Sequence, residues 1–235
     1  MQKTIDIDGL VTPVTIAKRK GAKSIRIAIK NDGRVRLTIP HGVPEFMAKK
    51  FLISRLDWIK EHQQLDALLK DQAHIGKNHR LHIIVSDASR SHSKITNTAI
   101  IVHLPSKNSV ISPESQSILR KACEKALLQE AEMLFPQRLK TLSEKHNIAY
   151  SSITVKKLKS RWGACDNSNN LSFNSYLVQL DWKLIDYVML HELAHTIHHH
   201  HQESFWNFVA GICPNHKELR RELKTKQTAI APTNY

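Results

Sequence analysis

Residues 187–195 read YVMLHELAH and contain the pattern H-E-x-x-H, with His191 and His195 four positions apart. On a helix, residues four apart lie one turn apart on the same face, so both imidazoles can point at one site. Leu184 and Val188 extend the same stripe, so the apolar face of the predicted helix leads directly into the two histidines. Two imidazoles without a ligand would be poorly satisfied on such a face. The stretch therefore predicts a metal-binding helix.

The ligand type indicates zinc, because zinc binds imidazole nitrogen and a catalytic zinc site keeps one position open for water. Glu192 follows the first histidine and lies beside the same helix face. It can accept a proton from a metal-bound water, whose pKa the ion has lowered. These three residues predict metal-assisted hydrolysis.

A third protein ligand is needed, and the sequence leaves several candidates after the helix: His198, His199, His200, His201, Glu203 and His216. On a straight helix His198 lies about 10 Å along the axis from His191, too far to share its ion. We therefore expect the helix to bend or end before the third ligand.

Composition sets wide limits. The chain has 235 residues, 41% of them hydrophobic and 24% charged, as in ordinary globular proteins. It has no apolar run long enough for a membrane span, and its first residues do not resemble a signal peptide. The three cysteines are widely spaced and form no C-x-x-C pair, which argues against a disulfide framework and a thiolate zinc site. We expect a cytoplasmic protein with no membrane partner.

The net charge of +14 is compatible with a polyanionic binding partner. A predicted β-hairpin over 25–39 turns at Asn31-Asp32-Gly33, with alternating isoleucine, valine and leucine on one face. Its other face carries four basic residues, namely Arg26, Lys30, Arg34 and Arg36. This face is either a solvated sheet surface or a nucleic-acid surface, and its lack of aromatic residues weakens the second interpretation.

The periodicities predict an α+β fold, with an antiparallel β-meander over 1–40 and a C-terminal H-E-x-x-H helix. Between them we expect one helix from Pro44 to about Leu69, two strands within 80–104, and a helix from Ser112 to about His146 that Pro136 kinks or interrupts. Two more strands are expected over 148–157 and 170–178, separated by a loop.

The predicted organisation is a β-rich part with one long helix over 1–110, followed by a metallopeptidase core over 111–226. The two parts are expected to form one continuous domain over about 15–225. The tail 227–235 is expected to be disordered.

Several motifs in order resemble the YgjP-like zinc metallopeptidases. His191 to Trp206 reads HELAHTIHHHHQESFW, which is similar to the family pattern of HELxH, five residues, a third histidine and a Phe-Trp pair. The segment RWGAC at 161–165 resembles the family element RWGSC, and NLSFN at 170–174 matches the strand that follows it. The N-terminal hairpin matches as well, so the resemblance covers about residues 15–225.

The resemblance implies a zincin-like fold, one zinc ion, a peptide or protein substrate and His201 as the third ligand. It also places Arg161 near the metal helix, where this residue could contact an oxyanion or a substrate carboxylate, or form a structural ion pair. The chain departs from the family pattern at Ala164, which replaces serine, and around His201. Neither change removes a ligand, although both can alter the groups that surround the ligands.

Two other functions remain open at this point. A nucleotide phosphoanhydride could be the hydrolysed substrate, because the same water and a basic surface also suit phosphate. A nucleic-acid-binding module with a structural zinc is the second alternative, but an open metal position and Glu192 argue against it.

Overall fold

The structure is a computed structural model that describes residues 2–5, 7, 10, 14–29, 35–62, 68–158 and 161–226. Its chain forms two compact units, one made of Met1–Asp71, Ile83–His92 and His103–Arg120, the other of Gln72–His82, Ser93–Val102 and Lys121–Tyr235. None of the helices in the described ranges combines the length and the hydrophobicity that crossing a bilayer requires.

The first unit contains a four-stranded sheet with the order β1-β2-β4-β3. Its strands are β1 (Gln2–Ile5), β2 (Val14–Arg19), β3 (Arg26–Ile29) and β4 (Val35–Pro40). The antiparallel β3–β4 hairpin is confirmed, with Ile27 opposite Leu37. The simple meander is wrong, because β2 pairs with β4 in parallel and not with β3. Val35, Leu37 and Ile39 of β4 are buried completely or nearly so, and β4 lies inside the sheet. Strand β3 is half-exposed and forms an edge of the sheet.

The basic face of the hairpin is described only in part. Arg26 and Arg36 lie on the same exposed face, because Arg36 pairs with Ala28, two residues from Arg26. Lys30 and Arg34 lie outside the described residues, as do the Asn31-Asp32-Gly33 turn and the tail 227–235.

The helix expected from Pro44 is divided into α1 (Glu45–Ile53) and α2 (Leu56–His62). Ser54 and Arg55 separate them, and the Ser54 hydroxyl bonds back to the Phe51 carbonyl, which offers that carbonyl a partner outside the helical ladder.

A second sheet has the order β5-β6-β8-β7. The two strands expected within 80–104 are confirmed as β6 (His79–Ser86) and β8 (Ala99–Pro105). The sequence interpretation missed β5 (His74–Ile75) and β7 (His92–Ile95), the latter within the predicted polar link. Helix α3 (Pro113–His146) begins where predicted, after Ser112, whose hydroxyl accepts a bond from the Ser115 amide. It runs through Pro136 without interruption.

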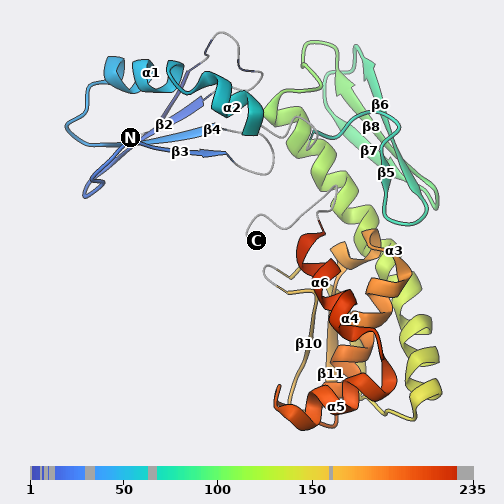
Figure 1. Ribbon diagram of the computed structural model, residues 1–235. Helices are drawn as coiled ribbons and strands as arrows, with labels where there is room; N and C mark the ends of the chain where they lie inside the picture. The colour runs from blue at the N-terminus through green and yellow to red at the C-terminus, as the bar shows by residue number, and fades with distance from the viewer. Residues whose placement is uncertain are drawn as a thin grey trace. The chain divides into compact units, whose positions relative to one another are not determined.

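The C-terminal part, drawn from yellow to red in Figure 1, contains the helix with the H-E-x-x-H pattern. It contains a three-stranded sheet of order β10-β11-β9, in which β11 is parallel to β9 and antiparallel to β10. These strands and the elements that follow are β9 (Ser152–Lys156), β10 (Gly163–Cys165), β11 (Asn170–Asn174), the 3-10 helix η2 (Ser175–Gln179), α4 (Trp182–His195), α5 (Glu203–Ile212) and α6 (His216–Thr225). Strand β10 lies within the predicted loop, and η2 replaces the end of the strand expected over 170–178. The α+β class is confirmed.

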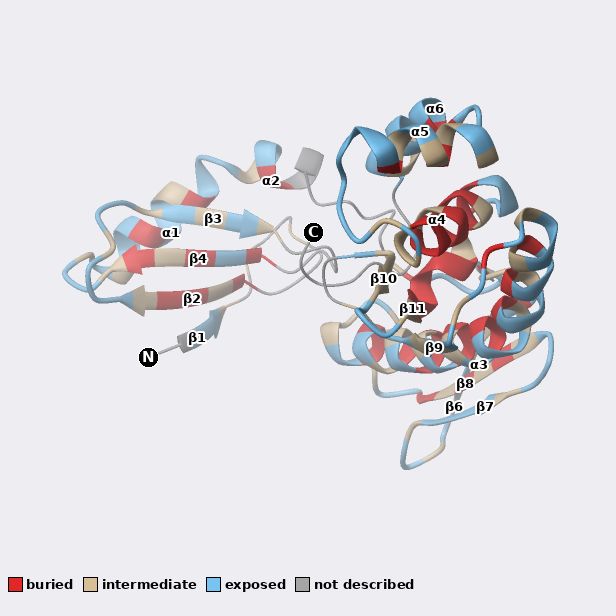
Figure 2. Cartoon of the chain, turned by 90° about the horizontal axis from the view of Figure 1, so that it is seen from below, coloured by how far each residue is buried: buried red, intermediate tan, exposed pale blue. Residues whose placement is uncertain are grey.

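Helix α4 packs against strand β10 and helices α5 and α6, and much of it is coloured as buried in Figure 2. Leu184, Val188 and Met189 are all less than 5% exposed. An ion pair ties α4 to α3, because Arg138 Nε donates to Asp186 Oδ1 over 2.6 Å, while a second guanidinium nitrogen binds Oδ2. Helix α4 is thus fixed by packing and by a two-point ion pair.

A buried carboxylate on α3 holds the β5–β6 turn. Glu130 is 1% exposed, and its Oε1 accepts bonds from the Lys77 amide over 2.9 Å and the Asn78 amide over 2.7 Å. Its Oε2 lies 3.1 Å from His79 Nδ1. At Gly76 a Cβ would lie 2.1 Å from that oxygen, so only glycine allows the turn to approach.

We predict that Glu130→Ala lowers the free energy of unfolding by about 3 kcal/mol or more, because two backbone N–H groups and His79 lose their buried acceptor. Urea denaturation measures this loss. The matched control is Glu132→Ala on an exposed position of the same helix, with an expected change below about 0.5 kcal/mol. Equal effects of the two substitutions would contradict a role for Glu130 in holding the turn.

Candidate metal centre

Helix α4 presents His191 and His195 one turn apart and then ends, as the sequence argument required. The last helical residue is His195, and the following amides of Ile197 and His198 bond to the Ala194 carbonyl over 3.2 and 3.0 Å. The His195 ring contributes to this ending, because its Nδ1–H donates to the His198 carbonyl over 2.9 Å. The chain then turns back before α5 begins at Glu203.

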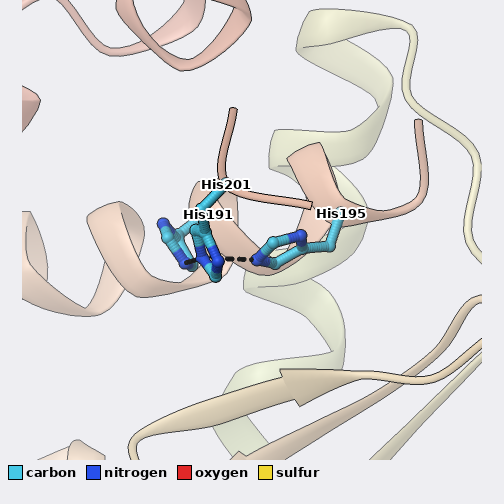
Figure 3. Close-up of side chains that lie close together, drawn as sticks. All are labelled: His191, His195 and His201. Carbon is cyan, nitrogen blue, oxygen red and sulfur yellow. Dashed lines mark hydrogen bonds between the residues drawn. The ribbon is translucent and has the colours of Figure 1, made fainter. Parts of the chain in front are cut away.

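This turn brings His201 to the two helical histidines. Its Nε2 lies 3.0 Å from His195 Nε2 and 3.2 Å from His191 Nε2. Figure 3 shows the three rings with these nitrogen atoms facing one another. In a tetrahedral zinc site with Zn–N distances of about 2.1 Å, two ligand nitrogens lie about 3.4 Å apart. The three imidazoles therefore have the spacing that such an ion requires.

The protonation of the three rings also suits a cation. Burial, the neighbouring histidines and Arg220 lower the pKa of His191 to about 3. Burial is likewise the main cause of the lowered pKa of His195 and of His201. Because His195 carries its proton on Nδ1, its Nε2 points a lone pair into the cluster. The Nδ1 of His191 is buried without a hydrogen-bond partner among the described residues. A neutral cluster with converging lone pairs is a good ligand set for a metal ion.

Glu192 is buried on the side of α4 that faces strand β10. It is 7% exposed, and its side chain packs on Gly163 so closely that a Cβ there would lie 2.6 Å from Glu192 Cγ and 2.7 Å from Oε1. Burial raises the pKa of Glu192 to about 8, while the positive charge of Arg161 acts in the opposite direction. The glycine of the RWGAC segment thus makes room for this carboxylate.

Asn174 fixes the segment that carries Arg161 and Gly163. Its fully buried side chain donates to the Leu158 carbonyl over 3.0 Å and to the Arg161 carbonyl over 2.9 Å. Its backbone amide donates to the Trp162 carbonyl over 2.8 Å. The asparagine that ends the NLSFN motif therefore holds the loop that faces Glu192.

Two aromatic residues of α5 support the histidine rings. Phe205 is fully buried, with its ring centroid 5.0 Å from that of His191, 4.4 Å from His195 and 4.9 Å from His201. Trp206 lies beside His201 and donates its Nε1–H to the His201 carbonyl over 3.1 Å. The Phe-Trp pair therefore forms one wall of the histidine cluster.

The other candidate ligands lie outside the cluster. The His198 ring contacts Phe208, with centroids 5.6 Å apart, and His216 is buried with its Nδ1–H donating to the Cys213 carbonyl. Within the described residues, His191, His195 and His201 form the one group of three side chains with metal-binding spacing. Burial raises the pKa of the Cys165 thiol to about 11, so it is not a thiolate at neutral pH.

The sequence interpretation missed Arg220 on α6. Its guanidinium carbon lies 4.7 Å from the centre of the Trp206 ring, and its charge acts on His191 and His201. No periodic or motif signal distinguishes it from the other basic residues of α6.

The basic hairpin residues are not part of this site. Arg26 and Arg36 belong to the first unit, whereas all the residues of the site described above belong to the second.

Comparison with known proteins gives a family match over most of the chain. Residues 23–226 match the family model described as the YgjP-like metallopeptidase domain. No curated protein matches at a significant level. Two solved structures are similar to part of the chain, and both are described as metallopeptidase zymogens. Jannalysin of Methanocaldococcus jannaschii is 24% identical, covers 37% of this chain and 89% of its own, and has a TM-score of 0.33. Abylysin of Pyrococcus abyssi is 20% identical with the same coverages and a TM-score of 0.34.

We predict that Gly163→Ala lowers the free energy of unfolding by about 1–3 kcal/mol, because the added methyl group overlaps the Glu192 side chain and β10 or α4 must move. Denaturant titration measures the change. Gly211→Ala is the matched control, since a Cβ there meets nothing within 4 Å and the residue lies in helix α5. This control should be more stable by up to about 1 kcal/mol. A Gly163→Ala protein that gains stability as the control does would disprove the close packing.

Proposed function

The chain belongs to the YgjP-like metallopeptidase domain family, and we propose that it hydrolyses peptide bonds at a zinc ion held by His191, His195 and His201. Metallopeptidases act on peptides or proteins, so the substrate class follows from the family. The family match gives no support to a nucleic-acid partner. We further propose that residues 111–226 form the catalytic core.

One observation carries the proposal: three neutral imidazole nitrogens converge beside a buried carboxylate. The nitrogens of His191 and His195 lie within 3.2 Å of His201 Nε2, and Glu192 follows His191 directly in the chain. These ligands come from one helix and the loop that follows it, and the described residues supply no fourth side chain of metal-binding spacing to the group. A purely structural zinc site would instead be closed by a fourth protein ligand.

The residues of this chain have separable roles in the proposed reaction. Zinc, when bound, supplies a Lewis acid that lowers the pKa of water and polarises a carbonyl. Burial raises the pKa of Glu192 to about 8, close to the pH at which a group can both take up and release a proton. In its ionised form Glu192 accepts a proton from the attacking water and passes it to the amine nitrogen that leaves when the peptide bond breaks. Gly163 allows the Glu192 side chain to pack directly on the backbone of β10, because a side chain at position 163 would occupy the same space. Arg161, whose charge acts on Glu192, stabilises negative charge that develops on the substrate.

We predict that His201→Ala weakens zinc binding as strongly as His191→Ala or His195→Ala, because each removes one of three ligand nitrogens. Competition with a chromogenic chelator on untagged protein measures the affinity, and metal analysis measures the content, expected at about one zinc per chain. Alanine variants of His198, His199, His200 and His216 are the controls and should keep wild-type affinity. A larger loss in His198→Ala or His216→Ala, with His201→Ala unchanged, would refute this ligand set.

We predict that zinc-loaded Glu192→Gln keeps its fold and its zinc but loses peptide hydrolysis by about 100-fold or more, because an amide of the same shape cannot accept the proton. Cleavage of an internally quenched peptide pool measures the activity, and circular dichroism monitors the fold. The matched control is Glu203→Gln at the exposed start of α5, which should remain active. Wild-type activity in Glu192→Gln would exclude this residue as the general base.

A further inference from the structure

Arg220 is joined to the histidine cluster through Trp206. The guanidinium carbon lies 4.7 Å from the centre of the Trp206 ring. That ring is inclined by 30° to the His201 ring, with centroids 5.8 Å apart. The tryptophan cannot move independently, because its Nε1–H is bonded to the His201 carbonyl. Stacking on this ring therefore holds an otherwise exposed arginine beside the site.

The contacts of Trp206 place Arg220 near the metal ligands. The Trp206 ring centroid lies 5.8 Å from that of His201 and 5.9 Å from that of His191. A positive charge beside a metal centre repels the cation and does not bind it. Arg220 is therefore placed for a ligand of the opposite charge.

The chain does not neutralise this charge within the residues that the structure describes. Among those residues no ion pair or hydrogen bond to Arg220 is found. Its guanidinium instead stacks on the Trp206 ring in a cation–π contact. Of the nearby acids on α6, Glu222 is already bound by Lys183 and Lys226. Arg220 therefore keeps its N–H donors free toward solvent.

A second arginine adds to the positive charge around the site. Arg161 is exposed, and it lies two residues before Gly163, on which the Glu192 side chain packs. Zinc, when bound to the three histidines, would add two positive charges. Two exposed arginines and a divalent ion favour a negatively charged ligand.

We propose that Arg220, held on Trp206, binds a carboxylate that the peptide substrate carries close to the bond that is cleaved. The planar guanidinium fork matches a carboxylate in a two-point interaction, which gives orientation as well as affinity. The carboxylate is either that of an aspartate or glutamate side chain or that of the peptide C-terminus. This inference rests on the proposed peptidase function and adds a substrate preference to it.

Matched peptide pools test the preference. One pool carries glutamate at the positions near the cleaved bond, a second carries glutamine there, and each is made with a free and an amidated C-terminus. Wild-type enzyme should prefer one carboxylate source, and the preferred member identifies it. In Arg220→Gln the KM for that member should rise about 10- to 100-fold, with kcat changed little, while the uncharged peptides keep their KM.

Arg221→Gln is the matched control, because it removes the neighbouring exposed charge on the same helix and should keep wild-type preference. Arg220→Lys, which keeps the charge without the fork, should recover part of the affinity. Zinc affinity of Arg220→Gln should equal or exceed that of the wild type, which excludes general disruption of the site. A uniform fall in kcat for all peptides, or no change for any, would overturn the inference.

Binding without turnover separates this inference from the peptidase proposal. In the Glu192→Gln background, calorimetry should show tighter binding of the preferred acidic peptide, and adding Arg220→Gln should abolish the difference. If the wild type cleaves no pool but this binding difference is present, the carboxylate site stands and the proposed reaction falls. If peptides are cleaved without any effect of charge or of Arg220, the reaction stands and the carboxylate site falls.

Discussion

The end of helix α4 at His195 is the constraint on which the site depends. Two histidines one turn apart define a direction but not a closed ligand set, and a helix that continued would carry His198 and His201 away from them. The bond from His195 Nδ1 to the His198 carbonyl couples this ending to the ligand chemistry. It satisfies a carbonyl just beyond the helix, and it leaves the lone pair of Nε2 directed at His201, 3.0 Å away. One hydrogen bond therefore helps to form the turn and to orient a ligand.

The rest of the C-terminal part places a rigid frame around that turn. Phe205 packs under all three imidazoles, Arg138 binds Asp186 across α3 and α4, and Gly163 contacts Glu192 from the sheet. Each contact restricts a different group, namely the ligand rings, the helix that carries two of them, and the proposed base. Asn174 restrains the backbone that carries Gly163 and Arg161, because it bonds to the carbonyls of Arg161 and Trp162. Precise placement of this kind is what allows a few polar groups to act together on a substrate.

The sequence predicted those parts whose signal is local. The H-E-x-x-H spacing gave the helix and two members of the cluster, and the alternation around the Asp-Gly turn gave the β3–β4 hairpin. Predictions that depend on long-range competition were less successful. The order β1-β2-β4-β3 reflects which strand buries most apolar surface, and β10 has only three residues whose pairing with β11 cannot be read from periodicity. The packing of Gly163 on Glu192 and of Arg220 on Trp206 joins elements that are distant in the sequence, so neither contact has a local signature.

The electrostatic design of the site follows from its ligand type. Three neutral imidazoles would leave the full charge of a divalent ion uncompensated, whereas a carboxylate ligand would remove part of it. That choice favours strong polarisation of a bound carbonyl, but it also makes the cluster repel further cations. Exposed Arg161 and Arg220 nevertheless lie near the site, Arg161 two residues before the glycine that contacts Glu192 and Arg220 on the ring of Trp206. Their positive charge is less unfavourable when an anion enters, which is the part that the proposed substrate carboxylate would take.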